Sequence, residues 1–179
     1  MSQKVKDAPK KKQEAITTSV KVAIMPDADP SPLLSSLSIM SLELRASILA
    51  AQKNLPEAKA LFAQAAQEEK GLGYREPPTY IRPVGETEGL ALLHAGDFAD
   101  AHKAYESALA ERPNSGFPLY GMARSSEAAG NSTTARAEYA KFVDAWKRAD
   151  PRASEMAHAQ EYLAGKKTVA GTSETTQSQ

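Results

Sequence analysis

The sequence predicts an all-α protein built from repeated pairs of helices, and three observations lead to this prediction. Hydrophobic residues make up 41% of the 179 residues, aromatic residues only 6%, and alanine is abundant. This mixture fits closely packed helices better than a β-sandwich, in which aromatic and β-branched residues dominate. Between residues 33 and 164, apolar residues recur at helical spacing, and one residue pattern returns at a fixed interval.

The two ends of the chain differ in composition from the region between them. Residues 1–32 are lysine-rich near the start and contain "PDADPSP", so we expect a disordered or loosely packed basic segment followed by a linker. Within it, "VKVAIM" is compatible with a short strand or with an arm that packs on the domain. Residues 165–179 are polar, which predicts a disordered tail. The helical domain is therefore expected to span residues 33–164.

A pattern of a turn, a small residue and an aromatic residue occurs three times. The second and third copies are 34 residues apart without a gap, as Gly96 and Gly130 show, whereas the first copy precedes the second by 43 residues. The corresponding positions, copy by copy, are Asn54, Ala58 and Phe62, then Asp97, Ala101 and Tyr105, then Asn131, Ala135 and Tyr139. A fixed period of this kind indicates supersecondary units that stack on one another.

Each copy begins with a residue that can cap a helix. Asn54, Asp97 and Asn131 have side-chain oxygens able to accept a hydrogen bond from a first-turn N–H. We expect two helices per unit, closely packed where small residues meet, with an aromatic residue between neighbouring units. The small residues are Ala46, Gly89, Ala123, Ala58, Ala101 and Ala135, and the aromatic residues are Phe62, Tyr105 and Tyr139.

A last helix is expected to follow the third unit and to end at Gly165. Asp150 would be its N-cap and Pro151 its first residue, a position where proline is common. Its narrow apolar stripe consists of Met156, Ala159 and Leu163. We interpret this helix as a cap on the open end of the stack.

The helix–turn–helix period of 34 residues resembles the tetratricopeptide repeat (TPR). The likeness extends from Leu42 to Trp146. It is strongest in the second copy, where the matching residues are Gly89, Leu92, Gly96, Asp97, Phe98, Ala101, Tyr105, Ala108 and Pro113. The segment "YREPPTYIRPVGETEGLALLHAGDFADAHKAYESAL" further resembles the C-terminal repeat region of large, uncharacterised bacterial TPR proteins, from which no activity can be transferred. Gly85 and Glu88 depart from the pattern, which has an aromatic residue or leucine there.

The resemblance implies a short right-handed α-solenoid of about three TPR-like helical hairpins plus the C-terminal capping helix. In this family the first helices form a concave groove, and the residues that the resemblance places there are Glu43, Ser47, Glu86, Leu90, Phe117, Tyr120, Arg124 and Glu127. The glutamates argue against a clamp for a terminal carboxylate, and the aromatic and cationic residues suit a mixed contact instead. The predicted function is a non-catalytic protein–protein interaction module that binds a peptide or helix. The alternative is a structural, oligomerisation or capping domain of a larger assembly.

The remaining sequence argues against several classes of function. Acidic and basic residues balance at 22 each, so a nucleic-acid-binding protein is not expected. Cysteine is absent, which removes disulfides and thiolate metal sites. A run of about 18 apolar residues and a signal peptide are also missing, so we expect no membrane span and, by default, a cytoplasmic protein. The histidines lack metal-site spacing and are expected at the surface: His94, His102 and His158.

Two features leave an alternative open. Glu88 and His94 could act as acid and base if a pocket joined them, although a salt bridge of Glu88 is the favoured interpretation, and we expect no enzyme activity and no cofactor. The inserted residues 74–82 either form one lip of a ligand groove or pack Tyr74 and Tyr80 on the helices, which we favour.

Overall fold

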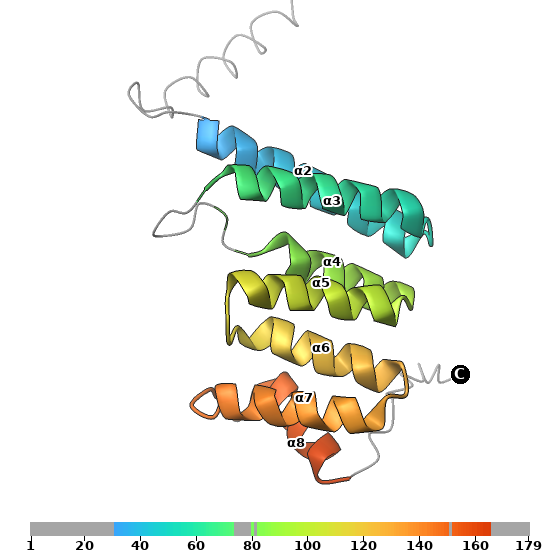
Figure 1. The fold of residues 1–179 in the computed structure, drawn as a ribbon, viewed down its shortest axis with the longest axis vertical. Helices are drawn as coiled ribbons and strands as arrows, with labels where there is room; N and C mark the ends of the chain where they lie inside the picture. Colours follow the sequence, from blue (N-terminus) through green and yellow to red (C-terminus); the bar gives the residue numbers. More distant parts are fainter. Residues whose placement is uncertain (1–30, 74–79, 81, 151, 166–179) are drawn as a thin grey trace, which may run out of the picture. The chain divides into compact units, whose positions relative to one another are not determined.

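The computed structural model describes residues 31–73, 80, 82–150 and 152–165. Within this part of the chain there are seven α-helices and no strand. They are α2 (Ser31–Ala51), α3 (Leu55–Gly71), α4 (Val84–Ala95), α5 (Phe98–Glu111), α6 (Gly116–Ala128), α7 (Ser132–Ala145) and α8 (Ser154–Leu163) (Figure 1). The all-α fold class is therefore confirmed for the described residues. The predicted disordered ends lie almost wholly outside them, although residues 31 and 32 already belong to α2.

The chain divides into two compact units, Met1–Leu34 and Ser35–Gln179. Only residues 31–34 of the first unit, which open α2, are described. All packing below concerns the second unit.

In the second unit, helices that are consecutive in the sequence pack against each other. Contacts join α3 to α4, α4 to α5, α5 to α6, α6 to α7 and α7 to α8, and α4 also contacts α6. Figure 1 shows α3 to α7 lying side by side in sequence order. Short connections favour this arrangement because they leave a helix little choice but to pack beside its predecessor. The finer prediction of a right-handed solenoid of TPR-like hairpins stays a prediction.

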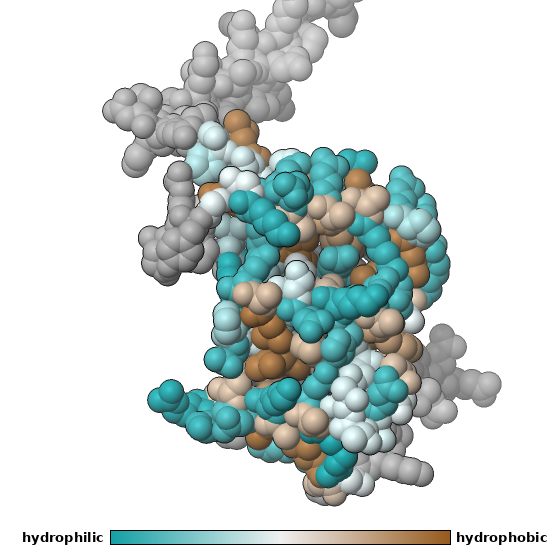
Figure 2. All heavy atoms as spheres, in the orientation of Figure 1, coloured by the Kyte–Doolittle hydropathy of each residue, from teal (hydrophilic) through white to brown (hydrophobic). Residues whose placement is uncertain are grey.

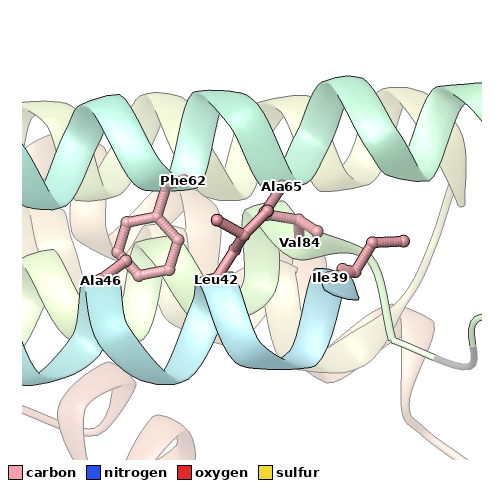
Figure 3. Close-up of a cluster of buried hydrophobic side chains, with 6 residues drawn as sticks. All are labelled: Ile39, Leu42, Ala46, Phe62, Ala65 and Val84. Atoms are coloured by element: carbon pink, nitrogen blue, oxygen red, sulfur yellow. The ribbon is translucent and has the colours of Figure 1, made fainter. Parts of the chain in front are cut away.

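Two clusters of buried apolar residues pack the helices of this unit together. The N-terminal cluster joins α2, α3 and the start of α4 through Ile39, Leu42, Ala46, Phe62, Ala65 and Val84 (Figure 3). In Figure 3 the ring of Phe62 extends from α3 toward Ala46 of α2. The C-terminal cluster joins α6, α7 and α8 through Ala123, Ala135, Tyr139, Phe142, Met156 and Ala159. Figure 2 shows that the face it draws is mostly hydrophilic, with apolar residues visible around α6.

All nine residues predicted at the contacts between helices are buried. They are Ala46, Gly89, Ala123, Ala58, Ala101, Ala135, Phe62, Tyr105 and Tyr139. The departure from the family pattern at Gly85 has a packing reason. A Cβ there would lie 2.6 Å from the carbonyl oxygen of Ala104, so only glycine lets α4 approach the backbone of α5 this closely.

The turns before α3, α5 and α7 have the same backbone conformation. Lys53, Gly96 and Gly130 all have positive φ, at 65°, 86° and 79°. The following residues are N-caps with nearly equal φ, at −85° for Asn54, −90° for Asp97 and −81° for Asn131. Their backbone N–H groups each donate to a carbonyl five residues earlier, at 2.9 Å. The predicted N-cap positions are confirmed, and the sequence offsets correspond to one repeated local structure.

The side-chain capping predicted at these positions is found only at Asp97, whose Oδ1 accepts a hydrogen bond from the Asp100 N–H at 3.4 Å. Asn54 and Asn131 make no cap hydrogen bond. The Asn54 amide instead donates to Glu57 Oε2 at 2.7 Å. In two of the three turns, then, the backbone alone sets the start of the helix.

The predicted start of the last helix is wrong. Helix α8 begins at Ser154, and its N-cap is Ala153 rather than Asp150. The Asp150 carboxylate accepts a hydrogen bond from the backbone N–H of Arg152 at 2.9 Å, so it closes a local turn instead of capping a helix. The predicted apolar stripe is present, since Met156 and Ala159 are buried in the C-terminal cluster.

The apolar surface of helix α2 is larger than the part that its contacts with other helices cover. By length and composition it could cross a membrane, with 21 residues, a mean hydropathy of 1.4 and 28% of that stretch buried inside the molecule. Core helices of soluble proteins pass the same test. The prediction of no membrane span, which relied on uninterrupted apolar runs, therefore stays a prediction.

Candidate binding groove

A groove with a volume of about 850 Å³ is lined by α4, α5 and α6, with one residue, Glu155, from α8. This volume lies toward the upper end of the roughly 300–1,000 Å³ typical of ligand pockets. Two rows of side chains, one on α4 and one on α6, supply most of the lining. We call this feature the groove.

The spacing of the residues in both rows follows the helical period. Glu86, Leu90 and His94 follow one another at intervals of four along α4, and Arg82 precedes them by four. On α6 the row consists of Phe117, Tyr120, Gly121, Arg124 and Ala128. Residues three or four apart lie on one face of a helix, so each row presents a single face to the groove.

Tyr105 of α5 contributes a deeply buried part of the lining. A Cβ built on Gly89 of α4 would lie 2.8 Å from its ring, and one built on Gly121 of α6 would lie 2.3 Å away. The ring is thus held between glycines of two helices. Burial raises the pKa of the Tyr105 hydroxyl, and the charge of Glu86 adds to the effect, so the group stays neutral at physiological pH.

One end of the groove combines a carboxylate with arginines. The Nε of Arg82 lies 4.0 Å from Glu86 Oε2, and the Ser115 hydroxyl donates to Glu86 Oε1 at 3.5 Å. Burial raises the pKa of Glu86, and the charges of Arg82 and Arg112 partly offset this rise. Arg112 also donates to the backbone carbonyl of Tyr80 at 2.8 Å, which ties the end of α5 to the inserted segment.

Two large apolar side chains in the groove remain open to solvent. Leu90 is 44% exposed and Phe117 is 57% exposed. The ring of Phe117 packs edge-on against Trp146, with centroids 5.4 Å apart, so its position is set before any ligand arrives. These side chains provide an apolar contact area between charged groups.

A polar cluster beside the groove connects α6, α7 and α8. Glu127 Oε2 accepts hydrogen bonds from Tyr139 Oη at 2.5 Å and Arg124 Nη1 at 3.1 Å, and it lies 2.9 Å from His158 Nε2. Burial alone would raise the pKa of Glu127, but the contacts with Tyr139 and His158 lower it below its usual value. This carboxylate therefore acts as a structural link between three helices.

Five of the eight residues predicted for the concave face line the groove, and three do not. The five are Glu86, Leu90, Phe117, Tyr120 and Arg124. Glu127 belongs to the polar cluster, and Ser47 is half-buried on α2. Glu43 is buried, and one of its oxygens accepts a hydrogen bond from the hydroxyl of Tyr80. Whether the five residues bind a ligand stays a prediction.

Sequence reasoning missed several lining residues, among them His94, Tyr105, Arg112 and Glu155. His94 could have been found, because it continues the α4 row four residues after Leu90. Arg112 and Glu155 carry no local signal, since they come from the end of α5 and from α8. Of the histidines expected at the surface, His102 contacts Glu138 Oε1 at 2.7 Å, and the side chain of His158 is mostly buried.

The acid–base alternative receives no geometric support from the described residues. His94 lines the groove, whereas Glu88 is not among its lining residues. Burial raises the pKa of Glu88, and Asp100 adds to this effect while Lys59 opposes it. Lys59 itself donates to Asp97 at 2.6 Å and to Asp100, and among the described residues Glu88 makes no salt bridge.

The inserted segment is described only in part. Tyr80 packs against the N-terminal cluster, as expected for a connection that covers the helices. The prediction for Tyr74 concerns a residue outside those that the structure describes. Among the described side chains, no group of three or more His, Asp or Glu residues is arranged to hold a metal ion.

Comparison with known proteins identified no relative of this chain. No family model, no curated protein and no solved structure matches the chain. The resemblance to TPR proteins therefore depends on the repeated residues and turns of this chain.

Proposed function

We propose that this protein is a non-catalytic binding module whose groove receives a peptide or a helix from another protein. The observation that carries the proposal is the exposure of Leu90 and Phe117 inside a groove of about 850 Å³. Covering apolar surface stabilises a complex by roughly 25 cal/mol per Å², before the costs of association. An apolar side chain of a ligand that covers Leu90 and Phe117, between the charged groups of the groove, would contribute this free energy to binding.

The proposal includes a TPR-type architecture, a short right-handed α-solenoid of helical hairpins capped by α8. It is supported by three turns with similar positive φ values and the same backbone hydrogen bonds, 43 and 34 residues apart. It is also supported by small residues buried at equivalent positions in each unit, Ala58, Ala101 and Ala135. In such stacks, first helices lie next to one another, which agrees with the contact between α4 and α6.

The charges of the groove favour a ligand of a particular kind. Its lining contains Arg82, Arg112 and Arg124 against Glu86 and Glu155. Burial weakens the acidic character of Glu86 because it raises the pKa of that group. We therefore expect a peptide with an apolar anchor residue flanked by at least one carboxylate.

The test is a selection of peptides from a random display library on the full chain, followed by titration of synthetic copies. A double substitution, Leu90→Ala with Phe117→Ala, should weaken binding of the selected peptides at least about tenfold, equivalent to about 1.4 kcal/mol. Both side chains are about half exposed and belong to neither apolar cluster, so circular dichroism should show an unchanged helix content.

The matched control is Leu37→Ala with Leu44→Ala, which removes exposed leucines from α2, away from the groove. This control should leave the affinity unchanged. Selected peptides that bind both double variants and the unaltered chain equally well would show that the groove is not the binding site.

A further inference from the structure

Helix α2 carries a stripe of exposed large apolar residues outside the groove. Leu37, Met40, Leu44 and Ile48 are 51%, 55%, 64% and 48% exposed. At 100° per residue these four positions fall within roughly 80° of arc, so they form one continuous line along the helix. We call this line the α2 stripe.

The α2 stripe lies opposite the face that the molecule already covers. Ile39, Leu42 and Ala46 are buried in the N-terminal cluster, on the other side of the helix. A helix that is apolar on two opposite faces is normally covered on both, because solvent-facing leucines and methionines gain nothing from exposure. The stripe is therefore a surface that lacks its cover among the described residues.

We propose that the α2 stripe is the dimerisation surface of this protein, where α2 packs antiparallel against α2 of a second copy. The two-fold axis passes beside Met40 and Ser41. In this register Leu37 of one copy lies opposite Leu44 of the other, and the two Met40 side chains meet at the axis.

The spacing of the residues in the α2 stripe favours the α2 stripe of a second copy as the partner that covers it. Steps of three and four residues between Leu37, Met40 and Leu44 match the seam of two packed helices. In this register Leu37 packs on Leu44 of the other copy, and the two Met40 side chains pack on each other. The α2 stripe is therefore complementary to itself, as a two-fold interface requires. Ser41 and Ser47 border the stripe and are small enough to let the helices approach.

Charge also favours this pairing. The only charged residues of α2 are Glu43, which is buried, and Arg45. In the antiparallel register the two Arg45 residues are nine positions apart, about 13 Å along the axis, whereas a parallel pair would place them side by side. Antiparallel helix dipoles attract as well. Within α2, the pairing therefore places no like charges side by side.

A membrane surface fits the stripe less well. Helices that lie on membranes carry many Lys and Arg residues on the polar face, and α2 has only Arg45. A membrane-spanning α2 would have to leave the N-terminal cluster, where Ile39 and Ala46 are fully buried. The spanning arrangement would therefore lose contacts that the dimer keeps.

The size of the stripe sets the expected affinity. Four half-exposed side chains form a patch on the order of the 300–600 Å² found on monomers. Two such patches bury less than the roughly 1,200 Å² of a standard interface. We therefore expect a weak dimer with a Kd in the micromolar range.

Sedimentation velocity over concentrations from about 1 to 300 µM tests the proposal on the full chain. The chain should shift from monomer to dimer as concentration rises, and Leu37→Ser with Leu44→Ser should weaken dimerisation at least tenfold. The matched control, Leu90→Ser with Phe117→Ser, makes comparable changes in the groove and should leave dimerisation unchanged. Circular dichroism verifies that each variant folds.

Cysteine cross-linking tests the register, and the chain has no native cysteine to interfere. A mixture of Leu37→Cys and Leu44→Cys chains should form the mixed disulfide in preference to either symmetric one. A preference for the disulfide between two Leu37→Cys chains would overturn the antiparallel arrangement.

Three further results would overturn the proposal. One is a monomer at every concentration. Another is a dimer that the Leu37→Ser and Leu44→Ser changes do not weaken. The third is a monomer that co-sediments with vesicles of phosphatidylcholine and phosphatidylglycerol through the same leucines. None of these bears on the groove, because peptide binding is tested at Leu90 and Phe117, which lie outside the α2 stripe.

Discussion

At the scale of single residues, Tyr105 shows how tightly this molecule is built. Its ring lies between Gly89 of α4 and Gly121 of α6, and any side chain at either glycine would overlap it. The repeated pattern in the sequence predicts a small residue at Gly89. Gly121 carries no such signal, and its role becomes visible only because α5 and α6 pack side by side.

The first prediction concerns Gly121→Ala. The added methyl group would lie 2.3 Å from the Tyr105 ring, which cannot withdraw because Gly89 closes the other side. We expect a loss of about 1–3 kcal/mol in the free energy of unfolding, as for other overpacked cores. Urea denaturation measures the change.

Gly71→Ala is the control for this substitution. Gly71 also lies in a helix, but a Cβ there would meet nothing within 4 Å. Alanine should be neutral or should stabilise by up to about 1 kcal/mol. If Gly121→Ala behaved like Gly71→Ala, the close packing of Tyr105 would be refuted.

At the scale of elements, the repeated turn explains how one local structure recurs with different residues. Gly96 and Gly130 adopt positive φ without strain, whereas Lys53 adopts φ of 65° in the first turn with a side chain attached. Left-handed backbone costs a residue with a side chain roughly 1–2 kcal/mol. The first turn is therefore the strained copy, and a hydrogen bond from Lys53 Nζ to the Ala95 carbonyl at 2.7 Å accompanies it.

The second prediction is that Lys53→Gly stabilises the protein by about 0.5–1 kcal/mol, because glycine removes the left-handed strain and the lost hydrogen bond is exposed. Thermal and urea denaturation measure the gain. Lys141→Gly, in the exposed part of α7, should instead destabilise by about 1 kcal/mol. Equal losses at both positions would contradict the strain at Lys53.

At the scale of the whole molecule, charges from several helices act on one half-buried carboxyl group, that of Glu69. Burial raises the pKa of Glu69 to about 7, and the charges of Glu111 and Glu43 contribute to this rise. The backbone N–H of Val84 donates to Glu69 Oε2 at 2.9 Å and, with the charge of Arg112, opposes the rise. Glu69 therefore connects the end of α3 to the start of α4 and responds to α2 and α5.

The third prediction follows from this pKa. The folded state holds the Glu69 proton more tightly than the unfolded chain, whose pKa is near 4.5. The stability that this proton contributes is complete below pH 4.5 and is lost as the pH rises through about 7. Glu69→Gln, which keeps an acceptor for the Val84 N–H, should flatten the decline in stability over this range.

Urea denaturation between pH 4.5 and 8 measures the slope. The decline should become smaller rather than vanish, since burial also raises the pKa of Glu86 and Glu88. Glu106→Gln, an exposed change on α5, should leave the profile as it is. A Glu69→Gln variant with the original slope would contradict a protonated Glu69 near neutral pH.

The whole molecule also separates two surfaces of different character. The groove is lined by α4, α5 and α6 and mixes apolar and charged groups, whereas the α2 stripe is apolar and bordered by serines. A ligand in one need not touch the other. The tests of peptide binding and dimerisation therefore use each surface as the control for the other.

Much of the fold could be predicted from residue spacing, and part of the candidate site from the resemblance to the tetratricopeptide repeat. The helical period and the offsets of 34 and 43 residues placed the turns and the buried alanines, because both are local or repeated. The groove residues Leu90 and Phe117 were predicted only through the resemblance to the tetratricopeptide repeat, which places them on the concave face. Asp150 was misplaced as a cap because a nearby backbone N–H competes for its carboxylate. Glu43 is buried rather than on the groove because its carboxylate accepts a hydrogen bond from the hydroxyl of Tyr80, 37 residues away, and no local pattern shows that contact.

By itself, the sequence determined the helices, the turns between them and the small and aromatic residues at their contacts, since these depend on periodicity and on the conformations that glycine, asparagine and alanine favour. Only the tertiary structure decided which face of α2 is covered, which glycines hold Tyr105, and which charges act on Glu69. These features depend on distances between helices that are far apart in the chain, and no local pattern encodes such distances.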